Sequence, residues 1–317
     1  MAVSDLRRDH LSAVQRRYPA VGVTTSAREL IDDPSVDAVV IATPVASHFD
    51  LAMAALRAGK HVLVEKPMAA TSEEALRLID EAARRRLVLM VDHTFVYTGA
   101  VRKIRELAAA GELGDIYYYD SVRINLGLFQ HDVNVFWDLA THDLSIMDFV
   151  LRQTPSAVSA TGLAHVAGEP ENIGYMTMFF DAPLIAHVHV SWLAPVKVRR
   201  TLLGGSRRMI VFDDLEASEK VKVYDRGISL NPSPENVYQM LVGYRTGDMS
   251  APNIAVGEAL SVEAAHFVDC IDRRQTPVTD GQAGLRVVRL LEAATQSMRD
   301  HGRLISIGGS VAIDSGR

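Results

Sequence analysis

The sequence predicts an α/β fold: an N-terminally incomplete, Rossmann-type parallel-sheet domain followed by an α/β domain with a large, mostly antiparallel open sheet. Two observations predict it. Up to about residue 114, short apolar stretches alternate with amphipathic helical stretches, as in parallel strands joined by crossover helices. After that point, strand-like stretches follow one another across short turns, which indicates antiparallel pairing. We therefore predict two domains, residues 1–114 and 115–317.

The elements expected in the first domain alternate along the chain. The strands are residues 2–5, 23–25, 37–43, 61–65 and 87–91, and the helices are residues 7–17, 27–31, 48–58, 72–86 and 101–110. The run over 37–43 is continuously apolar, as expected for a strand covered on both faces. Gly59 is placed to end one helix, and Thr71 or Ser72 can cap the next.

The second domain is expected to be built mainly from strands. They are residues 116–124, 157–162, 175–180, 184–192, 198–203, 209–212 and 221–224, with one helix over 138–151. A long loop over 231–253 and two amphipathic helices, 261–272 and 284–300, complete it. An open sheet leaves one face to be covered, so we expect a homo-oligomer, either a dimer or a tetramer.

Composition and charge exclude several classes of protein. A formal net charge of -6 over 317 residues gives no electrostatic footprint for nucleic acid and no polybasic membrane anchor. No apolar run approaches the roughly 18 residues needed to span a bilayer. Cys270 is the single cysteine, so an intramolecular disulfide is impossible, which fits a reducing compartment. We therefore predict a cytoplasmic protein whose partner is a small molecule.

The start of the chain bears on dinucleotide binding. A complete dinucleotide-binding unit places a glycine-rich turn roughly 20 residues before an acid that binds the ribose. If Asp5 is that acid, the glycines precede Met1, and no G-x-G-x-x-G occurs at another strand-to-helix junction. Two explanations stay open: the start lies inside a longer protein, or the chain is truncated and binds the cofactor weakly. Asp5 serves equally well as a cap for the helix that follows it.

Glu65-Lys66-Pro67 follows an expected strand of the first domain. Ligands of doubly wound sheets bind beyond the carboxyl ends of strands, so the tripeptide is well placed for chemistry. Pro67 biases Lys66 towards an extended backbone, which fixes where its ammonium group points. Such a lysine can stabilise a substrate oxyanion as hydride leaves. The alternative is an ordinary solvated loop lysine.

Asp138 and His142 begin the expected helix of the second domain. Positions four apart share one helix face, so both side chains can reach one site. Histidine titrates near neutral pH and can accept a hydroxyl proton, while a carboxylate nearby can hold the substrate. The alternative is a helix cap with an unrelated polar histidine. His187 and His189 share a strand face, but no third ligand has a recognisable spacing, so no metal site is expected.

In order and spacing, Thr43-Pro44 with His48, then Glu65-Lys66-Pro67, then Asp138 to His142 resemble the Gfo/Idh/MocA family of oxidoreductases. The resemblance covers the chain apart from the absent glycine loop. It implies that Lys66 and His142 are the catalytic pair, with Asp138 as a substrate-orienting carboxylate. It also implies a nucleotide-binding first domain whose cofactor-binding residues are Asp5, Thr43, Pro44, His48, Glu65 and Lys66.

Three further stretches resemble members that act on nucleotide-linked sugars, including the 3-dehydrogenases of sugars such as UDP-N-acetylglucosamine. They are residues 92–97, 123–125 and 244–248. Tyr97, Arg123 and Asn125 are the substrate-binding residues that this implies, together with Asp138 and His142. The guanidinium of Arg123 matches a phosphate or carboxylate, and the alternative is a strand-face arginine in a surface ion pair. Arg245 fits better in a structural role or at a subunit contact.

The resulting prediction is an NAD(P)-dependent sugar dehydrogenase that transfers hydride between the cofactor and a sugar hydroxyl or ketone. NAD is favoured over NADP because the Asp5 carboxylate would repel a 2'-phosphate, although Arg7 and Arg8 weaken that preference. Two rivals stay open. One is a redox-neutral hydrolase or lyase on the same fold, and the other is a sugar-binding or regulatory homologue without turnover.

Overall fold

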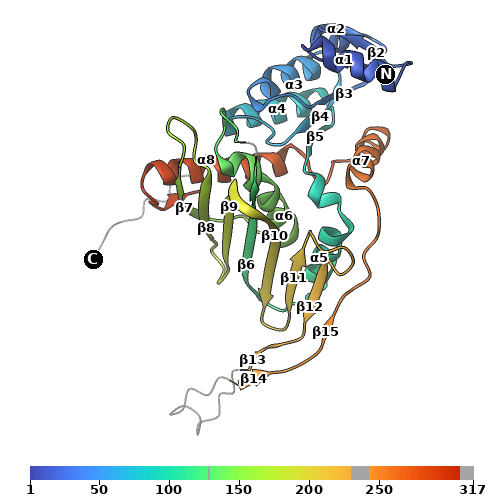
Figure 1. The fold of residues 1–317 in the computed structure, drawn as a ribbon. Coiled ribbons are helices and arrows are strands. Elements are labelled where there is room, and N and C mark those ends of the chain that lie inside the picture. Colours follow the sequence, from blue (N-terminus) through green and yellow to red (C-terminus); the bar gives the residue numbers. More distant parts are fainter. Residues whose placement is uncertain (128, 230–242, 308–317) are drawn as a thin grey trace. The chain divides into compact units, whose positions relative to one another are not determined.

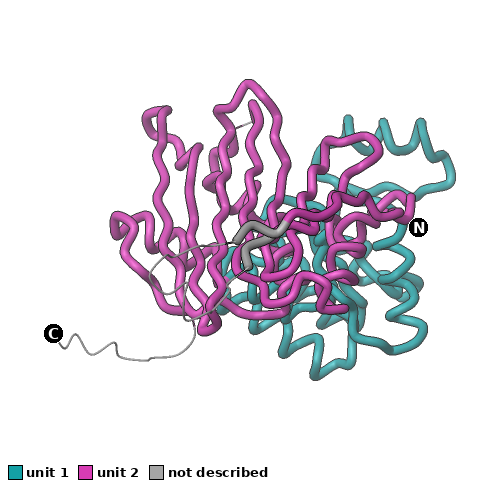
Figure 2. Tube along the Cα trace, turned by 90° about the horizontal axis from the view of Figure 1, so that it is seen from below, with its two compact units in different colours: residues 1–93, 261–288 teal, residues 94–260, 289–317 magenta. Residues whose placement is uncertain are grey.

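The computed structural model describes residues 1–127, 129–229 and 243–307, and the chain forms two compact units (Figure 1 and Figure 2). Unit 1 comprises residues 1–93 and 261–288, and unit 2 comprises residues 94–260 and 289–317. These units differ from the predicted division in two ways: the first boundary follows residue 93 rather than residue 114, and residues 261–288 return to unit 1. Each unit is described below by itself.

Unit 1 contains two parallel sheets. In the first, β1 (Ala2–Ser4) pairs with β2 (Gly22–Thr24). In the second, β4 (His61–Glu65) lies between β3 (Ala38–Ile41) and β5 (Leu89–Asp92). The helices of the N-terminal part are α1 (Arg8–Arg17), α2 (Ala27–Asp32), α3 (His48–Arg57) and α4 (Ser72–Arg85), with a short 3-10 turn, η1 (Val45–Ser47). The alternation of strand and helix confirms the predicted α/β class.

The core of unit 1 lies around the central strand. Val62 and Val64 of β4 and Leu56 and Leu78 of the flanking helices are completely buried. Thr71 caps α4 as predicted, since its hydroxyl accepts the Glu74 N–H. The edge strand β3 is less covered, because Val40 is 64% exposed.

Most of α7 and the start of α8 belong to unit 1. α7 (Ala259–Arg273) and α8 (Gly281–Arg299) are joined by a segment that pairs with the end of β5. The Val91 N–H donates to the Thr279 carbonyl at 2.8 Å, and the Thr279 hydroxyl donates to the Val91 carbonyl at 2.7 Å. These two hydrogen bonds join positions far apart in sequence, so no local sequence pattern predicts them. They hold residues 261–288 against β5.

Unit 2 is built on a nine-stranded sheet with the order β15-β12-β11-β10-β6-β9-β8-β7-β16 among the described residues. The strands are β6 (Ile116–Leu126), β7 (Ala157–Leu163), β8 (Ile173–Phe179), β9 (Ile185–Ser191), β10 (Leu193–Gly205), β11 (Met209–Asp213), β12 (Val221–Tyr224), β15 (Met249–Ser250) and β16 (Ile305–Ser306). Every pairing is antiparallel except that of β6 with β9, which confirms the predicted mostly antiparallel sheet.

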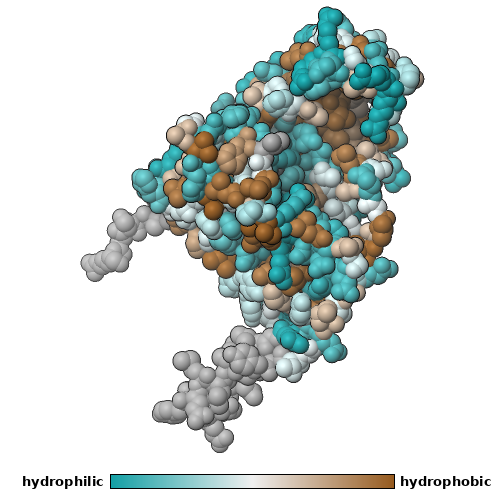
Figure 3. Space-filling view, in the orientation of Figure 1, coloured by the Kyte–Doolittle hydropathy of each residue, from teal (hydrophilic) through white to brown (hydrophobic). Residues whose placement is uncertain are grey.

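One face of this sheet is covered by helices and the other is open. Burial alternates along β6, where Tyr119, Ser121 and Arg123 are buried. The helices of unit 2 are α5 (Gly99–Ala109) and α6 (Thr141–Leu151), which lie with the end of α8 on one side of the sheet (Figure 1). Hydrophobic side chains gather over the strands among hydrophilic ones (Figure 3). Tyr175 and Ile185 are among the exposed apolar residues, and a homo-oligomer covering this face stays a prediction.

Two expectations for unit 2 need correction. Residues 136–140 form a π-turn, η3 (Phe136–Ala140), so the predicted helix over 138–151 is α-helical only from Thr141. The predicted loop over 231–253 contains strand residues, since β14 (Gly243–Arg245) pairs with β13 (Gly227–Ser229) and β15 pairs with β12. Residues 231–242 of that loop lie outside the described residues. Pairing with strands distant in sequence overrode the loop-like composition.

Candidate active site

The carboxyl ends of the parallel strands in unit 1 carry most of the predicted cofactor residues. Thr43 and Pro44 are exposed just after β3, and Glu65 ends β4. Glu65 is in register with Asp92, the last residue of β5. These residues therefore share one edge of the sheet, which is where doubly wound folds bind ligands.

His48 ties the loops at this edge together. Its ring is buried, with Nε2 2.7 Å from the Thr43 carbonyl oxygen and Nδ1 2.9 Å from the Pro67 carbonyl oxygen. A neutral ring donates from one nitrogen and a protonated ring from both. The prediction that His48 lines a dinucleotide stays a prediction, and its contacts favour an indirect role in which it holds the loops that carry Thr43 and Lys66.

Lys66 directly follows β4, and the Lys66–Pro67 peptide bond is cis. The Lys66 N–H donates to the Glu65 carboxylate at 3.1 Å. Burial, and then the charge of Asp92, raise the pKa of Glu65, while the hydrogen bond and the charge of Lys66 oppose that rise. The lysine thus stands beside carboxyl groups at a partly buried strand end.

Asp5 follows β1 and lies beside the start of α1. Its carboxylate accepts the Arg7 N–H at 2.8 Å and contacts His10 Nδ1 at 2.8 Å. These hydrogen bonds, the one from Arg7 first, lower the pKa of the Asp5 carboxyl. The carboxylate is ionised and 35% exposed, so capping of the turn and binding of a ribose hydroxyl stay compatible.

His142 lies in the first turn of α6 in unit 2. Its ring meets the edge of Phe95, with ring centroids 5.0 Å apart in a T-shaped arrangement. The guanidinium carbons of Arg123 and Arg199 lie 4.6 Å and 5.7 Å from the centroid of the same phenyl ring. Phe95 therefore contacts the imidazole and two cations at once.

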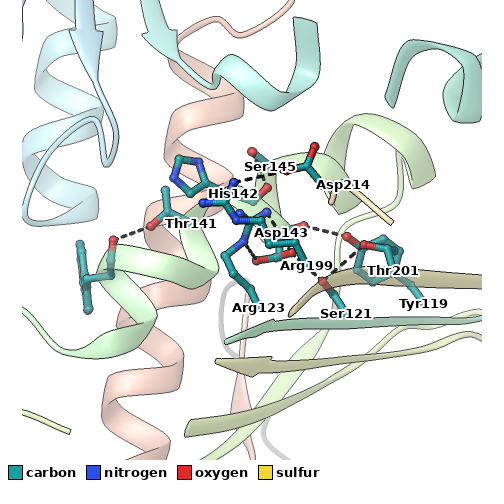
Figure 4. Close-up of polar contacts among 11 residues, drawn as sticks. Tyr119, Ser121, Arg123, Thr141, His142, Asp143, Ser145, Arg199, Thr201 and Asp214 are labelled. Carbon is teal, nitrogen blue, oxygen red and sulfur yellow. Dashed lines mark hydrogen bonds and ion pairs between the residues drawn. The ribbon is translucent and has the colours of Figure 1, made fainter. Parts of the chain in front are cut away.

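The residue after His142 anchors the helix to the sheet. Asp143 accepts hydrogen bonds from Arg123 Nε at 2.6 Å and from Ser121 Oγ at 2.6 Å, and Figure 4 shows these side chains meeting. The Tyr119 hydroxyl donates to the Asp143 main-chain carbonyl at 3.1 Å. Arg123 is only 3% exposed, so it forms an ion pair as in its structural alternative, but a buried pair rather than a surface one, and this argues against the predicted contact with substrate.

Asp138 lies in the π-turn that precedes α6. Its carboxylate accepts a hydrogen bond from Trp192 Nε1 at 3.0 Å, and Trp192 is almost fully buried. A Cβ atom on Gly127 would come within 2.7 Å of the Trp192 ring, so a glycine is needed there. π-turns occur often at functional sites, and this one places Asp138 one turn before His142.

The two remaining predicted substrate residues differ in accessibility. Tyr97 is 2% exposed and packs under the Arg102 guanidinium, which favours a packing role over contact with substrate. Asn125 is half-buried on the face of β6 that also bears Ser121 and Arg123. Its role stays a prediction.

Sequence reasoning missed several residues that shape these regions. Asp143 and Phe95 lie inside stretches that were singled out, but their own roles depend on partners from β6. No local sequence pattern points to Trp192 or Glu263, because each faces a residue more than fifty positions away: Asp138 for Trp192 and Asp92 for Glu263. Among the described residues, no group of three or more His, Cys, Asp or Glu side chains is arranged to hold a metal ion.

Comparison with known proteins places these features in a family. Residues 1–93 match the model of an oxidoreductase family with an NAD-binding Rossmann fold, and residues 101–211 match the GFO/IDH/MocA C-terminal domain. The chain belongs to the Gfo/Idh/MocA oxidoreductase family. The predicted family and its nicotinamide cofactor are thereby confirmed. In the described ranges, no helix is both long enough and apolar enough to cross a membrane.

Relatives and solved structures agree with this assignment. The chain is 30% identical over 256 residues to the UDP-N-acetylglucosamine 3-dehydrogenase of Acidithiobacillus ferrooxidans, covering 80% of this chain and 76% of the relative. The solved structure of that enzyme matches this one with a TM-score of 0.78 and 27% sequence identity, and the match covers 94% of this chain and 89% of the enzyme's chain.

Two further members widen the range of relatives. The NADP-dependent scyllo-inositol 2-dehydrogenase of Bacillus subtilis is 26% identical over 322 residues, covering 94% and 87% of the two chains. The structure of GenD2 from gentamicin A biosynthesis in complex with NAD has a TM-score of 0.80 at 25% identity, covering 97% and 88%. Two of these relatives are thus named as dehydrogenases, one of a nucleotide sugar and one of a polyol.

Proposed function

We propose that this chain is an NAD-dependent dehydrogenase that oxidises a hydroxyl of a nucleotide-linked sugar, or reduces the matching ketone. The observation that carries the proposal is that this member of the family has a lysine directly after a parallel strand, and an aspartate and a histidine four positions apart where a helix begins. Lys66 follows β4 in the unit matched by the NAD-binding model, and Asp138 and His142 begin the helix of the other unit.

Each residue has one role in this proposal. The His142 imidazole accepts the proton of the reacting hydroxyl as a general base. The Lys66 ammonium donates a hydrogen bond to a substrate oxygen and stabilises its developing charge. The Asp138 carboxylate, oriented by the Trp192 indole, accepts a hydrogen bond from a neighbouring sugar hydroxyl. When bound, the nicotinamide supplies the hydride acceptor.

The residues of unit 1 fit part of the cofactor. Thr43 and Pro44 are exposed beyond β3, and the ionised Asp5 carboxylate beyond β1 can accept hydrogen bonds from ribose hydroxyls while repelling a 2'-phosphate. Because of this carboxylate, we propose NAD rather than NADP as the cofactor.

The substrate class rests on relatives. The 3-dehydrogenase relative acts on UDP-N-acetylglucosamine and is 30% identical, whereas the scyllo-inositol relative is 26% identical. This ordering favours a nucleotide-linked sugar over a free polyol. Because Arg123 is engaged by Asp143, the proposal assigns it no contact with the substrate.

The test combines binding and turnover on the full chain. Calorimetry with NAD and with NADP measures cofactor choice, and NADH absorbance with UDP-N-acetylglucosamine or scyllo-inositol measures turnover. We expect tighter binding of NAD and a rise in absorbance with the nucleotide sugar. Products formed without a net change in NADH would instead support a redox-neutral enzyme. Binding of sugar without turnover, insensitive to Lys66→Ala, would support a non-catalytic homologue.

A further inference from the structure

Glu263 is a buried acid that the proposed chemistry does not use. It lies near the start of α7 in unit 1 and is 0% exposed. In the described part of the chain, neither of its carboxyl oxygens has a hydrogen-bond donor. Burying an ionised carboxylate without a donor or a cation is very costly, so this side chain needs another explanation.

The side chains that face Glu263 are themselves acidic: the carboxyls of Asp92, at the end of β5, and Glu65, at the end of β4. The main-chain N–H of His93 also faces Glu263 and opposes the rise of its pKa, but it donates to the Val91 carbonyl at 2.8 Å. Glu65 and Asp92 are register partners on adjacent parallel strands, and Lys66 adjoins Glu65. Burial and the charges of Asp92 and Glu65 raise the pKa of Glu263 to about 9.

The chemistry of carboxyl groups resolves this arrangement. Two ionised carboxylates are acceptors only and cannot bond to each other, whereas a protonated carboxyl has one O–H that can donate. A proton kept on Glu263 removes one buried charge and supplies a donor to the neighbouring carboxylate. The hydrogen bond from carboxylic acid to carboxylate is of the strong, charge-assisted kind.

We propose that Glu263 is a positioning residue that stays a neutral carboxylic acid and donates a hydrogen bond from its hydroxyl to Asp92. Through Asp92 it braces the ends of β4 and β5, next to the Lys66 loop. α7 is thereby tied to the strand ends that carry the proposed catalytic lysine. The protonation state stands on the structure alone, and only the effect on turnover rests on the proposed function.

The first experiment measures the proton on Glu263 without any substrate. At pH 7, the infrared difference spectrum between the wild type and Glu263→Gln should contain the carbonyl stretch of a protonated carboxylic acid. That band should fade as the pH rises through about 9. Glu73→Gln, at an exposed position of α4, is the matched control. This variant keeps the Glu263 acid, so its difference spectrum against the wild type should lack the band. Absence of the band at pH 7 overturns the proposal.

The second experiment follows stability against pH. The folded state binds the Glu263 proton more tightly than the unfolded chain, so the wild type loses stability as the pH rises between 4.5 and about 9. Relative to Glu263→Gln, its unfolding equilibrium constant should rise up to about tenfold per pH unit in that window. Parallel curves for the two proteins would show that Glu263 is ionised in the fold, against the proposal.

The third experiment tests the positioning role. Glu263→Leu keeps the approximate volume but removes the donor to Asp92, and we expect kcat to fall about tenfold, with a smaller change in KM. Glu263→Gln keeps an N–H donor and should restore most of the lost kcat. Equal kcat for both variants would refute positioning. If the wild type turns over none of the sugars tested, the infrared and stability measurements still decide the protonation state.

Discussion

Each unit of this protein places a candidate catalytic group beside a buried acid, and the two units stabilise that acid in opposite ways. In unit 2, Asp143 follows His142 and receives hydrogen bonds from Arg123 and Ser121. In unit 1, Glu263 and Asp92 lie near Lys66, and the Glu263 oxygens have no donor in the described structure. One acid is compensated by a cation, and the other by its own proton.

This difference has consequences for stability against pH. Arginine stays charged at every accessible pH, so the Arg123–Asp143 pair persists through neutral and alkaline conditions. The proton on Glu263 is lost as the pH approaches about 9. Alkaline conditions should therefore loosen unit 1 before unit 2, and variants of the two acids should separate these effects.

The largest effects are expected from the candidate catalytic groups themselves. His142→Ala removes the proton acceptor and should lower kcat by about 10²–10⁴-fold. Lys66→Ala removes the donor to the oxyanion and should lower kcat by about 10²–10³-fold. Steady-state kinetics with NAD and the nucleotide sugar would measure both. Lys103→Ala on α5 and His131→Ala at an exposed position are controls whose kcat should stay near that of the wild type. If His142→Ala and Lys66→Ala both kept wild-type kcat, the site assignment would be wrong.

The next largest effect is expected in the stability of unit 2. Arg123→Met leaves the buried Asp143 carboxylate without its cation, which should cost about 3–5 kcal/mol of unfolding free energy in a urea titration. Arg28→Met is the matched control, because Arg28 pairs with Asp32 on an exposed surface and should cost less than about 1 kcal/mol. If Arg123→Met lowered the unfolding free energy by no more than Arg28→Met does, the buried ion pair would contribute little to stability. The comparison between the units would then fail.

Much of the fold could be predicted because its signals are local. The strand His61–Glu65 was predicted with the bounds that it has, and the cap at Thr71 follows from a residue and its near neighbours. The motifs around Lys66 and His142 were likewise readable from order and spacing. Strand and helix periodicity depend on side chains a few positions apart, so they survive without tertiary information.

The remaining features depend on contacts between distant positions. Glu263 lies in a helix that was predicted, yet its partner Asp92 is far away in sequence, so its burial carries no local signal. Arg123 forms an ion pair, but a buried one rather than the surface pair expected as its alternative, because its partner Asp143 comes from another element. The π-turn at Asp138 was missed because the apolar pattern around it also fits an α-helix.

A smaller effect is expected where unit 2 orients its second carboxylate. Trp192→Phe keeps the packing but removes the N–H that donates to Asp138, and kcat should fall about tenfold. Trp137→Phe is the matched control, since its indole donates to the Thr295 hydroxyl rather than to a carboxylate. We expect a smaller loss of kcat there, and equal losses would argue against orientation of Asp138 by Trp192.

The smallest effect is expected when Asp143 loses its hydroxyl donor, Ser121, but keeps its cation, Arg123. Ser121→Ala removes one donor but leaves Arg123 in place, so unfolding free energy should fall by about 1.5 kcal/mol, the lower value for a hydrogen bond to a charged group. Ser159→Ala removes a hydroxyl that donates to the Gly302 carbonyl, a neutral acceptor, and should cost about 0.5–1 kcal/mol. A larger loss at Ser121 in urea titrations supports an ionised Asp143. Equal losses would mean that Asp143 behaves as a neutral acceptor, like the proton-bearing acid of unit 1.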